Sequence, residues 1–240
     1  MVAVSLKKKK ATSAAAKYLT VDDITGAAKD MGLGLGDLAV DSGGNLILGQ
    51  DIVTKALASA AASDPAVKSG DVQVLPIVSA TVAKGGLAAL TFEISGDRFG
   101  AVKTAADMKV MKILADGRGI MFDTALSSTG FADKHAALFA DDGSTLVTGS
   151  VDKTATYKLT VFIQDNGKFD LCSGDSEGKV IDPVAVVKVA SEDSAASGDV
   201  TSGDTSGDKT SRHHGSGCNA GFPALLALMA IPFAVRRKKK

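Results

Sequence analysis

Tryptophan is missing from this 240-residue sequence, and only two tyrosines and two cysteines are present. An exposed aromatic platform of the kind that stacks on sugar rings is therefore poorly supplied. Cys172 and Cys218 are too few for a disulfide framework, and they occupy different settings, an acidic stretch and the head of an apolar tail. Glutamate is also scarce, with three residues against 24 aspartates. With so many Thr, Val, Gly and Asp, the composition favours β structure with tight turns over a helical bundle.

Motifs that carry catalysis are lacking as well. The sequence has no Gly-x-Ser-x-Gly turn and no glycine loop followed by a lysine suited to phosphate. His135 stands alone, and His213 and His214 fall in a polar Ser/Gly stretch where a weak metal site is the alternative to simple filler. We predict no catalytic residue, no metal site and no cofactor, and hence a protein that is not an enzyme.

An acidic stretch at 170–178, followed by Asp182, is the best candidate for calcium. It lacks the spacing of an EF-hand loop, so we expect it to form solvent-exposed turns, with a calcium site as the alternative. Cys172 lies in the same stretch with only Lys168 and Lys179 as basic neighbours, which disfavours a reactive thiol.

The formal net charge of zero conceals a strong segregation of charge. Residues 1–17 and 218–240 each carry five basic residues and no acid. Residues 18–217 therefore hold 17 of the 27 basic residues against all 27 acidic ones, a net charge of −10. We call residues 18–217 the body. Because the body is this acidic, it repels the phosphate groups of DNA and RNA, and we predict no nucleic-acid partner.

Residues 18–70 are expected to form a small α-rich unit. Thr20 can cap a helix over 21–28, because acids in the first turn complement the helix dipole. Short strands at 38–40 and 45–48 flank a Gly turn and predict a hairpin. An Ala-rich stretch at 50–62 predicts a second helix, with its apolar stripe on Ile52, Val53, Ala56, Leu57 and Ala60.

From 71 to 190 the hydrophobic period changes from helical to alternating. Residues 87–95 alternate cleanly, and 157–165 followed by Asn166-Gly167 and 168–171 predicts a hairpin with a type I′ turn. Further strands are expected at 72–83, 108–114, from 120, 136–140, 144–148 and 184–189. The fold class predicted is mostly β, an antiparallel immunoglobulin-like β-sandwich that follows the α-rich unit.

Residues 191–217 repeat Ser-Gly-Asp triplets and contain no Leu, Ile, Phe or Tyr. Such a segment buries too little apolar surface to offset its ordering entropy, so we predict a disordered linker whose ends lie on average about 30 Å apart. The basic start at 1–17 is also predicted to be disordered. It has the lysines of a secretory leader without an apolar core, and we expect the true start to lie upstream.

The tail at 218–240 consists of an apolar run and a basic end. The run at 220–235 has 16 residues and contains Pro223 and Pro232. As a hydrophobic helix it measures roughly 24 Å, short of the roughly 30 Å hydrocarbon core. The basic end stops transfer and stays on the cytoplasmic side, which leaves everything before it outside. These stop residues are Arg236, Arg237, Lys238, Lys239 and Lys240.

The hexapeptide that opens this tail is Gly217, Cys218, Asn219, Ala220, Gly221 and Phe222. With the apolar run and the basic end, it closely resembles the Synerg-CTERM sorting domain, although Pro223 replaces the usual Gly. Three stretches of the body, 92–97, 112–117 and 169–183, also resemble proteins that carry this tail. The resemblance implies export, handling by a dedicated sorting protease, and retention at the bacterial cell envelope. It also implies that Cys218 is the site of processing or lipid attachment.

Three functions follow as expectations. The first is a membrane-anchored cell-surface protein of unknown ligand, non-enzymatic and structural, adhesive or ligand-displaying. The second is an extracellular carbohydrate-binding module or hydrolase, which needs paired carboxylates in a cleft or an aromatic platform. The third is a membrane protein with an ordinary C-terminal single span.

Overall fold

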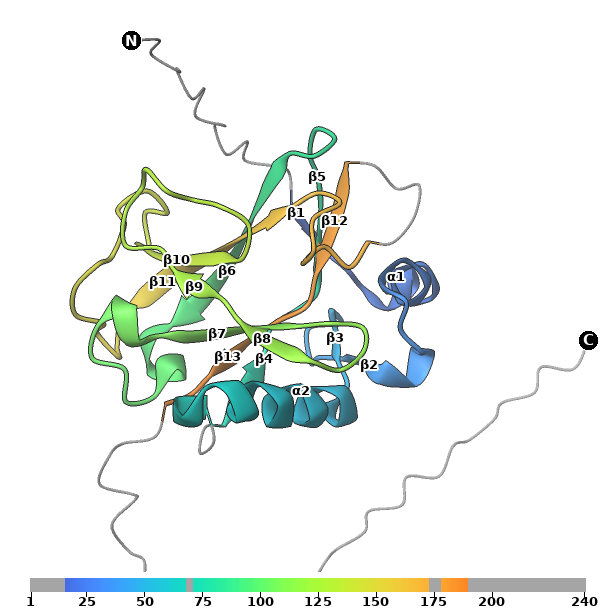
Figure 1. Cartoon of the computed structure of the whole chain (residues 1–240), viewed down its shortest axis with the longest axis horizontal. Coiled ribbons are helices and arrows are strands. Elements are labelled where there is room, and N and C mark those ends of the chain that lie inside the picture. The colour runs from blue at the N-terminus through green and yellow to red at the C-terminus, as the bar shows by residue number, and fades with distance from the viewer. Residues whose placement is uncertain (1–15, 68–70, 173–177, 190–240) are drawn as a thin grey trace, which may run out of the picture. The chain divides into compact units, whose positions relative to one another are not determined.

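The computed structural model describes residues 16–67, 71–172 and 178–189 (Figure 1). The chain divides into two units, Met1–Ser197 and Gly198–Lys240, and every described residue belongs to the first. The predicted linker at 191–217 and the predicted C-terminal helix fall outside the described residues.

The described part of the chain is mostly β and is built from four sheets. The first sheet has the order β6 (Leu87–Ser95), β11 (Thr156–Gln164), β10 (His135–Ala140) and β9 (Asp123–Thr124). The second has the order β4 (Val72–Val74), β13 (Val184–Val187), β7 (Lys109–Ile113) and β8 (Gly119–Met121). The third is β1 (Ala16–Tyr18), β5 (Val78–Thr81) and β12 (Lys179–Asp182), and the fourth pairs β2 (Leu38–Val40) with β3 (Leu46–Leu48). All pairings are antiparallel except that of β9 with β10.

A large apolar cluster joins the first sheet to the second and third. β6 contributes Leu90, Phe92 and Ile94 to it, as the alternation predicted, while Thr91 and Glu93 on the opposite face are exposed. β11 pairs with β6 along its whole length and contributes Tyr157, Leu159, Val161 and Ile163 to the same cluster. The period of two therefore places one face of each strand in a shared core.

The other face of β11 is also covered. Phe162 is buried there, and its ring stacks on Phe131 with centroids 4.3 Å apart. Phe131 comes from the segment between β9 and β10, so the chain itself covers this side of the first sheet.

Helix α2 covers the second sheet from its other side (Figure 1), and α1 contributes to the same apolar cluster. Along β7, Val110 faces the large cluster while Met111 and Ile113 face the helices. Along β13, Val184 and Val186 likewise face the large cluster, and Ala185 and Val187 face the helices. Both strands are therefore buried on both faces. In Figure 1, α2 (Gln50–Ser63) runs beneath β4 and β8, and α1 (Ile24–Met31) lies beside β12.

The elements expected in 18–70 are confirmed with small changes of boundary. The second helix begins at Gln50 and buries Ile52, Val53, Ala56 and Ala60, with Leu57 half-buried. The hairpin of β2 and β3 forms in register. The first helix starts later than predicted: Thr20 and Asp23 form a capping box around a 3₁₀ turn, η1 (Val21–Asp23), and α1 then ends at Gly32, with φ +66°.

The predicted hairpin around Asn166-Gly167 is wrong. β11 already pairs with β6 on one side and β10 on the other, so neither edge remains for 168–171. That segment instead folds into turns, with Asp170 accepting hydrogen bonds from the backbone N–H groups of Asn166 at 3.1 Å and Cys172 at 2.9 Å.

Two other predicted strands differ from expectation: one is divided, and the other is reduced to a bridge. The stretch 72–83 divides into β4 and β5 around Leu75-Pro76-Ile77, because Pro76 has no N–H to donate to a ladder. The stretch 144–148 forms only an isolated bridge between Leu146 and Phe139. The prediction of mostly β structure is confirmed, and the immunoglobulin-like arrangement stays a prediction.

Candidate functional site

The residues of the sorting signal, from Gly217 to Phe222, and the basic end from Arg236 to Lys240 all lie outside the described residues, as do His213 and His214. The proposed role of Cys218 therefore stays a prediction. Among the residues that the structure describes, neither α-helix has the length and hydrophobicity needed to cross a membrane.

The acidic stretch of the sequence is described at Asp170, Leu171, Cys172 and Gly178. Cys172 is buried, and its backbone N–H donates to Asp170 Oδ1. Within residues 16–67, 71–172 and 178–189, no three or more His, Cys, Asp or Glu side chains gather in a way that could hold a metal ion.

His135 is the first residue of β10 and pairs with Phe162 of β11 and Asp123 of β9. Its ring is half-buried, and its Nδ1 atom finds no hydrogen-bond partner within the described residues. It lies at the end of a central strand, because β10 runs between β11 and β9.

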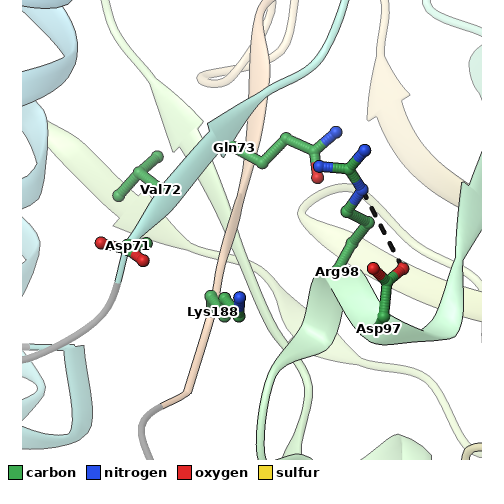
Figure 2. Close-up of a pocket in the computed structure, with 6 residues that line it drawn as sticks. All are labelled: Asp71, Val72, Gln73, Asp97, Arg98 and Lys188. Carbon is green, nitrogen blue, oxygen red and sulfur yellow. Dashed lines mark ion pairs between the residues drawn. The ribbon is translucent and has the colours of Figure 1, made fainter. Parts of the chain in front are cut away.

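A polar pocket of about 290 Å³ opens where β4, η4 (Gly96–Phe99) and the residue after β13 meet (Figure 2). Its lining residues are Asp71, Val72, Gln73, Asp97, Arg98 and Lys188. In Figure 2 the side chains of Gln73 and Arg98 point toward each other, and the Gln73 Oε1 atom is buried without a hydrogen-bond partner among the described groups.

The charges of this pocket do not suit acid–base catalysis by Asp97. A hydrogen bond from the Ser95 side chain, and then the charges of Arg98 and Lys188, hold the pKa of Asp97 below its usual range. Its carboxylate lies 4.0 Å from Arg98 Nε. A carboxylate kept ionised in this way is a poor proton donor near neutral pH, so the pocket offers hydrogen bonds and charge for binding.

A pair of ionisable residues lies inside the core, where β12 passes into β13 beside β7. Lys112 of β7 pairs in register with Val184, and Asp182 stands two residues before Val184. The alternation along the strand turns Lys112 and Asp182 to the side of Val110 and Val184, in the large cluster. Lys112 Nζ contacts Asp182 Oδ1 directly, and both side chains have 0% exposure.

Burial dominates the electrostatics of this pair. It lowers the pKa of Lys112 and raises the pKa of Asp182 to about 6, in each case against the attraction of the other partner. Burial also raises the pKa of Asp170, whose charge acts on both Lys112 and Asp182, as does that of Asp133. The Oδ2 atom of Asp182 has no hydrogen-bond partner among the described residues.

Asp165 and Asp133 fix the loops around this pair. Asp165 is buried and accepts hydrogen bonds from the backbone N–H groups of Gly85 at 2.7 Å and Gly178 at 2.9 Å. Asp133 accepts one from the backbone N–H of Gln164 at 2.9 Å. These carboxylates tie the end of β11 to loops distant in sequence.

Sequence reasoning missed the buried pair. The signal available was Lys112, which has only apolar neighbours within 110–114 and so no solvent side for its ammonium group, whereas Lys109 at the start of the strand stays half-buried. That signal indicates a buried partner for Lys112 without identifying Asp182.

Comparison with protein-family models, with curated proteins and with solved structures found no match for this chain.

Proposed function

We propose that this protein is a non-enzymatic structural, adhesive or ligand-displaying module, held at the outer face of a bacterial cell envelope by its C-terminal signal. The observation that carries the proposal is the tail, in which Gly217 to Phe222 precede an apolar run and five basic residues. Basic residues retained on the cytoplasmic side put the body outside. A polar linker of the composition at 191–217 suits a tether between a body and a membrane.

The partners in this proposal are the membrane and a sorting protease that acts near Cys218. The apolar run is short for a permanent span. Processing at Cys218, with lipid attached to the thiol, would replace the anchor that cleavage removes. Two or more acyl chains hold a protein stably, whereas one holds it only marginally.

The body supports this reading through the use of its aspartates. Many exposed carboxylates in the described residues accept backbone hydrogen bonds within their own turns, including those of Asp41, Asp116, Asp142 and Asp152. Acidic side chains used in this way stabilise loops, as a display scaffold requires. An immunoglobulin-like arrangement of the sheets belongs to the same proposal.

The decisive experiment is mass spectrometry of the mature protein isolated from cell envelopes. We expect the mature chain to end near Cys218 and to carry added lipid mass. Cys218→Ala should abolish that mass and release or mislocalise the body, whereas the control Ser216→Ala should be processed normally. A wild-type chain that retains 219–240 without modification would establish the ordinary single span instead.

Topology provides an independent check. Protease added to intact cells is expected to digest the body, because the proposal places it outside. Full protection of the body on intact cells, with digestion after lysis, would contradict the proposed location.

The carbohydrate-binding alternative has one specific location, the pocket of Gln73 and Arg98. The unpartnered Gln73 Oε1 and the two cations, Arg98 and Lys188, can hydrogen-bond to hydroxyl or carboxylate groups of an acidic sugar. Retarded migration in gels that contain an acidic polysaccharide, lost in Arg98→Ala, would favour it. Equal migration of both forms would count against it.

A further inference from the structure

Lys112 and Asp182 are poorly arranged as a permanent ion pair. Two charges removed from water repay their desolvation only when geometry is good and the remaining polar atoms are hydrogen-bonded. Here both side chains are fully buried, while Asp182 Oδ2 has no partner in the described part of the chain. Burial shifts both groups toward their uncharged forms, since it lowers the pKa of Lys112 and raises the pKa of Asp182 to about 6.

An amine and a carboxyl held in contact inside a desolvated site are a pair of potential reactants. A desolvated lysine is an activated nucleophile, and fixed contact between two reacting groups removes much of the entropic barrier to their reaction. Lys112 Nζ already contacts the carboxyl of Asp182. The pairing of Lys112 with Val184 and the fixed position of Pro183, whose carbonyl accepts from the Ile113 N–H, hold the two backbones together.

We propose that Lys112 and Asp182 condense to form an intramolecular isopeptide bond between Nζ and Cγ. The Nζ lone pair attacks Cγ to form a tetrahedral intermediate. The Cγ–Oδ2 bond then breaks, and Oδ2 leaves as water with the carboxyl proton and one proton from Nζ. An amine and a carboxylic acid give an amide and one water, so no oxidant or other reactant is needed. Oδ2 is the oxygen that has no hydrogen-bond partner among the described residues.

Asp170 is a carboxylate whose charge acts on both members of the pair. Three backbone N–H groups, those of Asn166, Cys172 and Ile181, fix its position. Burial raises its own pKa, and Ile181, one of the residues that donate to it, directly precedes Asp182. Asp170 acts in this scheme as a positioning residue, and the inference does not depend on where the protein resides.

The test is the mass of the full chain after denaturation, followed by tryptic digestion. We expect the wild type to be lighter than its sequence by one water. Residues 110–118 and 180–188 should appear as one joined peptide, uncut after Lys112. Separate peptides ending at Lys112 and Lys188, with no joined species, would overturn the proposal.

Variants locate the bond and exclude other water losses. Lys112→Met should restore the missing water, whereas Lys109→Met, on the same strand, should leave the loss unchanged. Asp182→Asn should give the same joined peptide by losing ammonia instead of water. Asp-Gly sequences such as Asp116-Gly117 can lose water as cyclic imides, but Asp182 precedes Pro183 and cannot. Water loss that persists in Lys112→Met would contradict the proposal.

The role of Asp170 has its own measurement. Asp170→Asn keeps a hydrogen-bond acceptor in the turn but removes the charge that acts on Lys112 and Asp182. We expect it to fold with the same circular dichroism and to form the joined peptide at least tenfold more slowly, with an altered dependence on pH. A folded variant with the wild-type rate and pH profile would remove Asp170 from the scheme.

Discussion

At the scale of single residues, the preference for aspartate over glutamate has a physical explanation. An aspartate carboxylate reaches a backbone N–H two or three residues away, and a glutamate side chain is too long to close the same turn without losing more freedom. Asp142 illustrates this geometry, since its Oδ1 accepts from the N–H groups of Ser144 and Thr145, both at 2.8 Å. The composition could predict turns of this kind, and the structure shows them.

Asp142 provides a prediction on pH. Hydrogen bonds from the Thr145 side chain, then from the backbone of Thr145 and Ser144, lower the pKa of Asp142 to about 2. In the unfolded chain an aspartate carboxyl has a pKa of about 3.9. A carboxyl whose pKa is lower in the folded state stabilises the fold at pH values above about 3.9, and this stabilisation is lost as the pH falls toward 2. The thermal midpoint of Asp142→Asn should therefore lie below that of the wild type at pH 7, and the difference should shrink between about pH 4 and pH 2.

Asp141→Asn is the matched control. Its carboxylate lies 3.4 Å from Lys158 Nζ and is mostly exposed, so the variant should change the midpoint less at every pH. A difference between Asp142→Asn and the wild type that stays constant down to pH 2 would show that charge is not the cause.

The buried pair shows where prediction from single residues stops. That Lys112 lies in a strand follows from the apolar pattern around it. That it meets Asp182 depends on the register of β7 with β13, two segments 70 residues apart in sequence. Local periodicity contains no information on such a register.

At the scale of elements, predictions succeeded where a periodic pattern was long. They also succeeded where a turn followed a strand whose hydrogen-bonding edge was open to the next segment, as in the hairpin of β2 and β3. β6 has the predicted bounds, and α2 differs by one residue at its end. The Asn-Gly signal failed because the neighbours of β11 are set by distant strands. Neither the helix-facing side of β7 nor the cover of Phe131 over Phe162 could be inferred from one segment alone.

Gly119 gives a prediction on the packing of α2 against β8. A Cβ added there would lie 2.3 Å from the Ala56 carbonyl oxygen and 2.6 Å from Met111 Sδ, so the helix would have to move. We expect Gly119→Ala to lower the free energy of unfolding by about 1–3 kcal/mol, measured by urea denaturation. The control is Gly26→Ala in α1, where a Cβ meets nothing within 4 Å and should stabilise the fold by about 0.5–1 kcal/mol. Equal effects of the two variants would contradict this account.

At the scale of the whole molecule, the three apolar clusters draw their members from residues 19–189. The chain up to Ser197 is one compact unit. We therefore expect a protein ending at Ser197 to fold as the full chain does. Its far-ultraviolet circular dichroism and thermal midpoint should match those of the full chain within error, and a midpoint lowered by several degrees would show that residues beyond 197 contribute to the body.

The position of β13 between β4 and β7 has a mechanical consequence. A pull on the body from its C-terminal side enters along β13 and shears the ladders on both sides together, whereas an edge strand would peel away one bond at a time. A covalent bond from Asp182 to Lys112 lies at the far end of that strand. Force would then pass directly from β13 to β7, and the intervening stretch of 113–181, with β10 and β11, would carry no tension.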